Sequence, residues 1–125
     1  MHVLRIDSRE ESELSERVLE KAQALNIKAE KEWLDIGDYV FNSVCFEAKS
    51  SFDFLQSIMS KRLWNQMDNM DRAFDDNLVI VYGSFDAAFR TYAAHSKSTM
   101  DKRAYRTLLH RRFYGSMGRI ILDYD

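Results

Sequence analysis

Two carboxylates and a lysine are spaced for chemistry in the segment LDIGDYVFNSVCFEAKSSFD, residues 34–53. Asp38 opens one short apolar run, and Glu47 and Lys49 belong to the next run. If the chain turns tightly at Asn42-Ser43, the two runs pair as a hairpin in which Asp38 lies opposite Glu47. Like charges directly opposite each other are destabilising, so this pairing indicates a functional reason for keeping both.

Side chains alternate along a strand, which predicts that Glu47 and Lys49 project from the same face of the sheet. Two carboxylates and an ammonium group on one face suit Mg²⁺-assisted hydrolysis of a phosphodiester. Mg²⁺ takes oxygen ligands, often one or two carboxylates, and Lys49 would position or deprotonate the nucleophile. The alternative is an ordinary strand pair in which Lys49 forms a salt bridge with Glu47, since short motifs recur by chance.

Hydrophobic periodicity predicts the elements that position these residues. The first elements are a strand at 2–6, a helix that ends near Asn26, a strand at 27–34 and paired strands at 38–41 and 44–49. The first helix follows Ser8 and Glu11, which have the spacing of a capping box. The later elements are a long helix at 51–74, a buried central strand at 78–82, helices at 85–95 and 99–113, and a last strand at 119–122. This order predicts one α/β domain over residues 1–125, with a mixed β-sheet flanked by helices.

Composition excludes several classes of protein. The chain has 125 residues, of which 46% are hydrophobic and 30% charged, as in ordinary globular domains. A single cysteine, Cys45, permits no internal disulfide. It favours an intracellular location, cytoplasmic, or nuclear in a eukaryote, and its apolar strand indicates a packing residue rather than a nucleophile. No apolar stretch reaches membrane-spanning length, so we expect no membrane association.

Positive charge is concentrated between residues 90 and 119, although the net charge of the chain is −2. Against the single acid Asp101, this region contains the basic residues Arg90, Lys97, Lys102, Arg103, Arg106, Arg111, Arg112 and Arg119. On a helix, Lys102, Arg106 and His110 would form one stripe that follows a phosphate backbone. A solvated helix face is the alternative.

Several motifs occur in a fixed order between residues 7 and 66. They are Asp7-Ser8-Arg9-Glu10, Gly37-Asp38-Tyr39, Glu47-Ala48-Lys49-Ser50-Ser51-Phe52-Asp53, Gln56-Ser57-Ile58 and Arg62-Leu63-Trp64-Asn65-Gln66. This series resembles the nuclease domain of the XPF family, whose pattern runs D-x-R-E, G-D-Y, E-R-K-x-x-x-D, Q-S-I and R-L-x-x-Q. The resemblance implies a restriction-endonuclease-like fold and a structure-specific DNA endonuclease of repair or recombination that uses Mg²⁺ or Mn²⁺.

The resemblance also assigns roles to individual residues. It implies that Asp38 and Glu47 bind the metal, with the carbonyl oxygen of Ala48 as a further ligand. Lys49 matches the catalytic lysine of the family, and Asp7 would lie at the edge of the site. The family has arginine where this chain has Ala48, so any contact made by that arginine is lost here.

Other matching positions have both a functional and a structural interpretation. Asp53 and Arg9 match family residues that support the site. Alternatively, Asp53 stabilises the first turn of a helix and Arg9 pairs with a nearby acid. Arg62 and Gln66 lie one helical turn apart, where they would contact a DNA phosphate or form an exposed polar stripe.

The sequence thus predicts a metal-dependent DNA endonuclease of the XPF type. One alternative is a catalytically inactive XPF-like domain that binds DNA or a partner protein, and another is a purely structural α/β interaction module. The resemblance also implies a homodimer, for which Phe85, Phe89 and Tyr92 would provide an apolar stripe on one helix.

Overall fold

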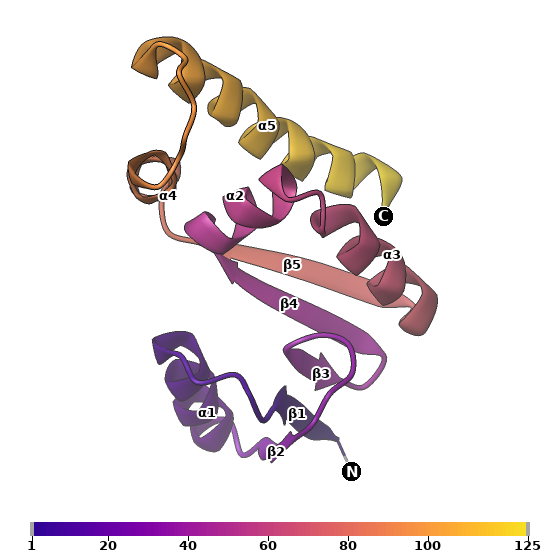
Figure 1. Cartoon of the computed structure of the whole chain (residues 1–125). Helices are drawn as coiled ribbons and strands as arrows, with labels where there is room; N and C mark the ends of the chain where they lie inside the picture. The colour runs from indigo at the N-terminus through magenta and orange to yellow at the C-terminus, as the bar shows by residue number, and fades with distance from the viewer. Residues whose placement is uncertain (1, 125) are drawn as a thin grey trace. The chain divides into compact units, whose positions relative to one another are not determined.

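The computed structural model describes residues 2–124 and contains a mixed five-stranded sheet with strand order β2-β1-β3-β4-β5 (Figure 1). The chain divides into two compact units. The first comprises residues 1–48 and 69–80, and the second comprises residues 49–68 and 81–125. Helices flank the sheet, as the sequence predicted. No helix within residues 2–124 is long and apolar enough to cross a membrane.

The first unit is built on β1, α1, β2, β3 and most of β4. Their bounds are β1 Val3–Asp7, α1 Glu13–Ala24, β2 Lys28–Glu32, β3 Tyr39–Phe41 and β4 Val44–Ser50. β1 pairs parallel with β2 and antiparallel with β3, and β3 pairs antiparallel with β4. The mixed pairing follows from the connections, because a helix returns the chain from β1 to β2 whereas a short turn joins β3 to β4.

Helix α1 begins one turn later than predicted. Its N-cap is Ser12, which exchanges hydrogen bonds with Ser15 in a capping box. The predicted box at Ser8 and Glu11 is wrong, because residues 8–11 lie outside the helix and the Ser8 amide instead bonds the carbonyl of Glu32 on β2. Pairing across the sheet took priority over the local motif.

The β3–β4 hairpin has the predicted turn. Asn42 has a φ of 56°, which asparagine tolerates better than most residues, and Phe41 pairs with Val44 and Tyr39 with Phe46. The strand pairing stops there, however. Asp38 lies just before β3, and its amide bonds the Phe46 carbonyl at 2.9 Å. The predicted direct pairing of Asp38 with Glu47 is therefore wrong.

The long helix predicted at 51–74 is instead two helices, α2 (Ser51–Met59) and α3 (Leu63–Ala73). At the end of α2, Lys61 adopts a φ of 65°, and its amide bonds the Ile58 carbonyl. The Arg62 amide bonds the Ser57 carbonyl, which completes a Schellman motif. The chain changes direction here at a left-handed lysine, without glycine or proline, so the sequence contained no residue typical of a helix end.

The second unit contains three helices that contact one another: α2, α4 (Phe85–Ala94) and α5 (Lys102–Asp123). The aromatic ring of Phe113 on α5 lies edge-on to Phe54 at 5.2 Å and to Phe85 at 5.4 Å. Phe85 and Phe89 are 6% and 4% exposed. These two aromatic residues belong to the core of this unit, so they are not available for the dimer surface that the sequence predicted.

The last predicted strand, residues 119–122, is also wrong, because α5 continues through it to Asp123. Arg119 lies over the ring of Trp64 at 3.9 Å, and Tyr124 stacks on the same ring and donates a hydrogen bond to Asp68. These contacts hold the end of α5 against the start of α3.

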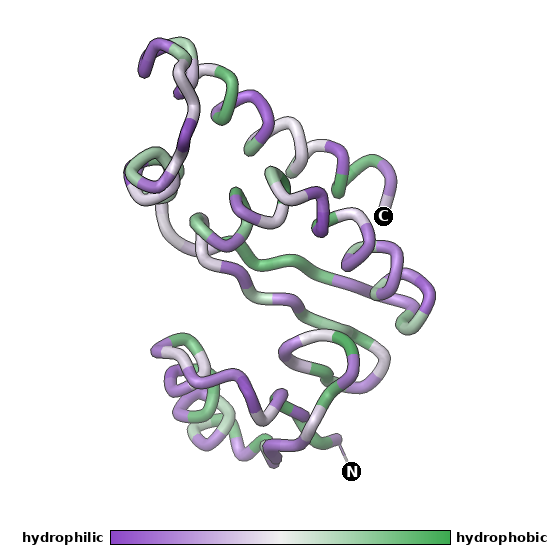
Figure 2. The backbone as a smooth tube through the Cα atoms, in the orientation of Figure 1, coloured by the Kyte–Doolittle hydropathy of each residue, from purple (hydrophilic) through white to green (hydrophobic). Residues whose placement is uncertain are grey.

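Strand β5 (Asp76–Tyr82) lies at the edge of the sheet rather than at its centre. Figure 2 shows it as a mainly hydrophobic run, which suggested burial on both faces. Its side chains instead alternate, and Leu78, Ile80 and Tyr82 are 52%, 41% and 40% exposed. The prediction of a buried central strand is wrong.

Candidate active site

Asp38 is held at the end of a loop by three hydrogen bonds within the first unit. Its amide bonds the Phe46 carbonyl, and its carbonyl accepts from the Asp7 amide at 2.8 Å. Its carboxylate oxygen Oδ2 accepts a 2.7 Å hydrogen bond from the Ala48 amide. Beyond the last strand pair, the Asp38 carboxylate thus accepts the amide of β4 that a backbone carbonyl would otherwise accept. This bond fixes Asp38 against the segment of β4 that carries Glu47.

Gly37 allows the loop to approach β4 closely. Its φ is +85°, and a Cβ atom at this position would lie 2.3 Å from the Sγ atom of Cys45. A side chain here would therefore displace the thiol or the loop. The glycine before Asp38 in the Gly37-Asp38-Tyr39 motif thus has a structural reason, since it brings the carboxylate-bearing loop onto the strand.

Cys45 is completely buried beneath this loop. Burial, together with the negative charges of Glu47 and Asp38, raises the pKa of its thiol to about 11. Both carboxylates are therefore near enough to act on the thiol, which stays protonated at neutral pH. Its burial and raised pKa fit the predicted packing role and argue against a nucleophile.

Glu47 and Lys49 lie on β4, two positions apart, so alternation places them on the same face of that strand. Glu47 is partly exposed, whereas Lys49 is buried and only 8% exposed. Between them, Ala48 directs its amide to Asp38. The backbone of Ala48 thus links the two segments that carry the acidic residues, a role that requires no particular side chain.

Asp7, at the end of β1, is buried and forms an ion pair with the half-exposed Arg9, with 3.0 Å between Asp7 Oδ2 and Arg9 Nε. Its other oxygen accepts a hydrogen bond from the Leu34 amide at 3.1 Å. Burial by itself would raise the pKa of Asp7, but the Leu34 amide and the Arg9 guanidinium together hold it below its ordinary value. These bonds give Asp7 a clear role in holding the loop from Leu34 to Asp38.

Replacing Asp7 with Asn should destabilise the metal-free protein by about 2 kcal/mol at neutral pH, because the hydrogen bonds to Arg9 lose their ionic partner. A lowered folded-state pKa contributes stability above the unfolded carboxyl pKa of about 4 and loses it as pH falls through the folded value. The difference in unfolding free energy between the parent and Asp7→Asn should thus become smaller in acid. Denaturant melts in chelator at pH 7 and pH 3 measure it, and an equal difference at both would contradict the ionic role.

Asp53, Arg62 and Gln66 lie in the second unit. Asp53 is exposed in the first turn of α2, where its amide bonds the N-cap Ser50 and its charge favours the helix. Arg62 is exposed and donates to Ser60 Oγ at 3.0 Å, immediately before α3. The buried Oε1 atom of Gln66 has no hydrogen-bond partner within residues 2–124.

The basic stripe on α5 is partly engaged by α4. Arg106 forms an ion pair with Asp86 and lies over the Phe85 ring, and His110 lies edge-on to the same ring at 5.1 Å. Lys102, at the start of the helix, is exposed. Lys102, Arg106 and His110 therefore all lie on α5, but Arg106 and His110 also contact α4.

The acidic residues match a cation that needs few protein ligands. Among residues 2–124 no group of three His, Cys, Asp or Glu side chains is arranged to hold a metal ion. Asp38 and Glu47 provide carboxylates, and the Ala48 carbonyl is a backbone oxygen on the same strand as Glu47. Mg²⁺ commonly binds to one or two carboxylates and fills its other positions with water or substrate phosphate, so this donor set fits it.

The mixed sheet flanked by helices matches the fold of solved XPF nuclease structures. The ERCC4 domain family matches residues 6–124, and the chain belongs to this family. The chain is 37% identical over 57 residues to the DNA repair endonuclease UVH1 of Arabidopsis thaliana, which corresponds to 45% of this chain and 6% of that protein.

Solved structures give the same fold. XPF from Aeropyrum pernix aligns with a TM-score of 0.68 and 25% identity over 97% of this chain. A structure of A. pernix XPF in complex with DNA aligns with a TM-score of 0.56 and 21% identity over 94% of this chain. The chain spans about half of the first structure, 53%, and 66% of the second.

Proposed function

We propose that the chain is a metal-dependent endonuclease that hydrolyses phosphodiester bonds in DNA, with a preference for branched or flap structures in repair or recombination. The observation that carries this proposal is the bond from the Ala48 amide to Asp38, which joins the Asp38 loop to the part of β4 that bears Glu47 and Lys49. Membership of a DNA-repair nuclease family supports the reaction class.

In this proposal Asp38, Glu47 and the Ala48 carbonyl would hold Mg²⁺ or Mn²⁺. The bound cation would lower the pKa of a water molecule and offset charge that develops on the phosphate. Lys49, which is buried on the same strand, would orient the attacking water or take its proton. Asp7 and Arg9 keep the Asp38 loop in place through Leu34.

The direct test is cleavage of defined DNA substrates. Single-stranded, duplex, flap and four-way-junction DNA of matched length are incubated with the protein over a titration of Mg²⁺ and of Mn²⁺. Metal-dependent cleavage that favours the flap or junction is the expected result. Absence of cleavage on every substrate with both metals, by a protein that melts cooperatively, would refute the endonuclease.

A catalytically inactive DNA-binding or scaffold domain is the second candidate. The observation in its favour is Ala48, which stands where the family pattern has arginine. The alanine keeps the backbone bond to Asp38, so it removes a side-chain contact without removing a metal ligand. Binding of branched DNA without cleavage in the same assay would favour this candidate. A protein that neither binds nor cleaves DNA would instead be a structural module.

Lys102 and Arg106 are proposed to contact DNA phosphates. The variant Lys102→Glu with Arg106→Gln should weaken binding to every DNA substrate and reduce the slope of log affinity against log salt by about two. Arg106→Gln is preferred to charge reversal because Arg106 faces Asp86. Lys28→Glu with Arg17→Gln, on β2 and α1, makes the same charge change and should keep the slope. If both variants have the same slope of log affinity against log salt, the stripe is a solvated surface that does not contact DNA.

A homodimer is also proposed, now through the end of α5 instead of the Phe85 stripe. Ile121 and Leu122 are 71% and 81% exposed there, which is unusual for adjacent apolar residues. Ile121→Glu with Leu122→Glu should shift the protein from dimer to monomer in sedimentation velocity. Leu25→Glu, at an exposed site in the first unit, should leave the dimer unchanged. A parent protein that stays monomeric at high concentration would contradict the proposal.

A further inference from the structure

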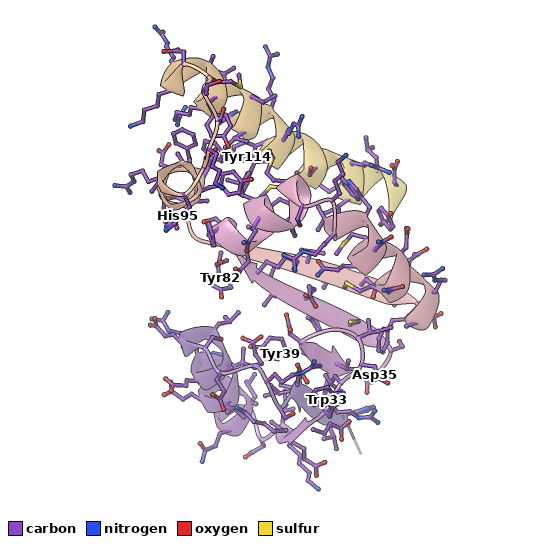
Figure 3. The ribbon with its side chains drawn as sticks, in the orientation of Figure 1. Trp33, Asp35, Tyr39, Tyr82, His95 and Tyr114 are labelled. Carbon is purple, nitrogen blue, oxygen red and sulfur yellow. The ribbon has the colours of Figure 1, made fainter. Side chains whose placement is uncertain are left out.

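Trp33 is exposed on the loop that joins β2 to β3, in the first unit. Figure 3 labels it there together with Asp35. Its side chain is 66% exposed, whereas the next residue, Leu34, is only 8% exposed. The loop is thus anchored by Leu34 while the adjacent indole extends into solvent. A single exposed aromatic residue is ordinary, so the contacts behind the ring decide whether it has a function.

One face of the indole is covered by a charged group that is itself fixed. The guanidinium carbon of Arg9 lies 3.7 Å from the centre of the Trp33 ring. Arg9 also donates to the Leu34 carbonyl at 2.6 Å and pairs with Asp7. Asp7 in turn accepts the Leu34 amide. This closed set of bonds orders the ring at the surface before any ligand arrives.

The occupant that fits the ring is a flat, uncharged group that stacks. Asp7 neutralises Arg9, and Asp35 on the same loop is acidic, so the surroundings of the ring do not favour a phosphate. A nucleobase has an aromatic face and stacks on tryptophan in many single-strand-binding proteins. Bases in a duplex are already stacked on their neighbours, so only an unpaired base has a free face.

The position of Trp33 in the sequence connects the ring to the acidic site. Trp33 and Asp38 end the same short loop, and an extended chain of this length spans at most about 17 Å. Asp7, which holds the Arg9 side of the ring, also donates its amide to the Asp38 carbonyl. A base on Trp33 would therefore belong to a nucleotide near the phosphodiester at Asp38.

We propose that Trp33, supported by Arg9, is a stacking site for an unpaired base of a DNA strand that enters the Asp38 and Glu47 site. This inference rests on the proposed endonuclease function and specifies its substrate. The preferred DNA has an unpaired nucleotide close to the cleaved bond. Stacking, unlike phosphate contact, depends little on salt, so this contribution persists at salt concentrations that weaken backbone binding.

The test uses tryptophan fluorescence in the presence of chelator, so that binding is measured without cleavage. The chain has two tryptophans, and Trp64→Phe leaves Trp33 as the only one. Single-stranded oligothymidine, an abasic strand of the same length and a blunt duplex are titrated into this variant. Oligothymidine should quench Trp33 strongly and the other two weakly. Equal quenching by the abasic strand would overturn the stacking site.

Affinity measurements on the otherwise unchanged chain separate the two proposals. Trp33→Ala should weaken binding of single-stranded DNA about 5- to 100-fold and leave duplex binding unchanged, while Trp33→Phe should retain most of the affinity. The exposure of Trp33 makes both variants compatible with the fold, which thermal melts verify. Normal affinity of Trp33→Ala in a protein that still cleaves DNA overturns only the stacking site. A parent that binds none of these DNAs overturns the endonuclease as well.

Discussion

Glu47→Gln is expected to abolish metal-dependent cleavage while leaving the protein folded. The amide has the size of the carboxylate, and position 47 is partly exposed, so the packing of β4 is retained. The change removes one of the two negative charges that we propose attract the cation. Lys49→Met should also lower the rate at least about 100-fold, the lower range for loss of an acid–base group. Single-turnover cleavage with Mg²⁺ and with Mn²⁺ measures both effects.

The choice of methionine at position 49 follows from burial. Lys49 is 8% exposed, so Lys49→Ala would remove packing as well as the ammonium group. Methionine fills similar space, and a comparison of the two variants separates catalysis from stability. Glu30→Gln, at an exposed carboxylate on β2, is the matched control and should cleave normally. Full cleavage by Glu47→Gln or by Lys49→Met would refute the assignment of that residue.

The hairpin could be predicted because its determinants are local. Asn42 tolerates the positive φ of the turn, and a turn of fixed length sets which residues pair. The position of Asp38 could not be predicted in the same way. Its departure from the strand pairing depends on Gly37, which allows close contact with Cys45 on β4, and on the hydrogen bond that the Asp7 amide of β1 donates to the Asp38 carbonyl.

The helical errors have a different physical cause. Apolar periodicity continues through Ser60 and Lys61, yet the chain breaks there, since a Schellman motif stabilises a non-glycine residue in the left-handed region. At the other end, the sequence predicted a helix that ends at residue 113 and a strand at 119–122, whereas α5 continues to Asp123. In the structure, Leu109, Phe113 and Ser116 are buried at positions i, i+4 and i+7, so one face of the continuous helix packs past Gly115.

The supporting residues of the site were predicted only in part. Pairing of Arg9 with a nearby acid was one of two interpretations, and the structure identifies that acid as Asp7. The stacking of Arg9 on Trp33 was missed, because the two residues come from different loops and no motif links them. The exposure of β5 was missed for a similar reason, since an unbroken apolar run does not reveal whether a strand has a neighbour on each side.

Asp38→Asn should leave the metal-free protein equally or more stable and remove most of the stabilisation by Mn²⁺. The asparagine carbonyl can still accept the Ala48 amide, so the bond that fixes the loop is retained. The negative charge near Glu47 and the buried Cys45 thiol is lost, which relieves repulsion in the absence of metal. A ligand that binds only the folded state stabilises it by about 2.7 kcal/mol at one hundred times its dissociation constant. Thermal melts in chelator and in excess Mn²⁺ measure both quantities.

Asp38→Ala distinguishes the charge of Asp38 from its hydrogen bond. Alanine leaves the Ala48 amide without its acceptor, so this variant should lose about 1–3 kcal/mol in chelator, in contrast to Asp38→Asn. Both variants should lose the Mn²⁺ shift, because both lack the carboxylate. If Asp38→Asn instead loses stability in chelator and keeps the Mn²⁺ shift, the carboxylate is a structural anchor, and the cation must bind elsewhere. If both variants keep the shift but only alanine is destabilised, Asp38 positions the loop through its hydrogen bond alone.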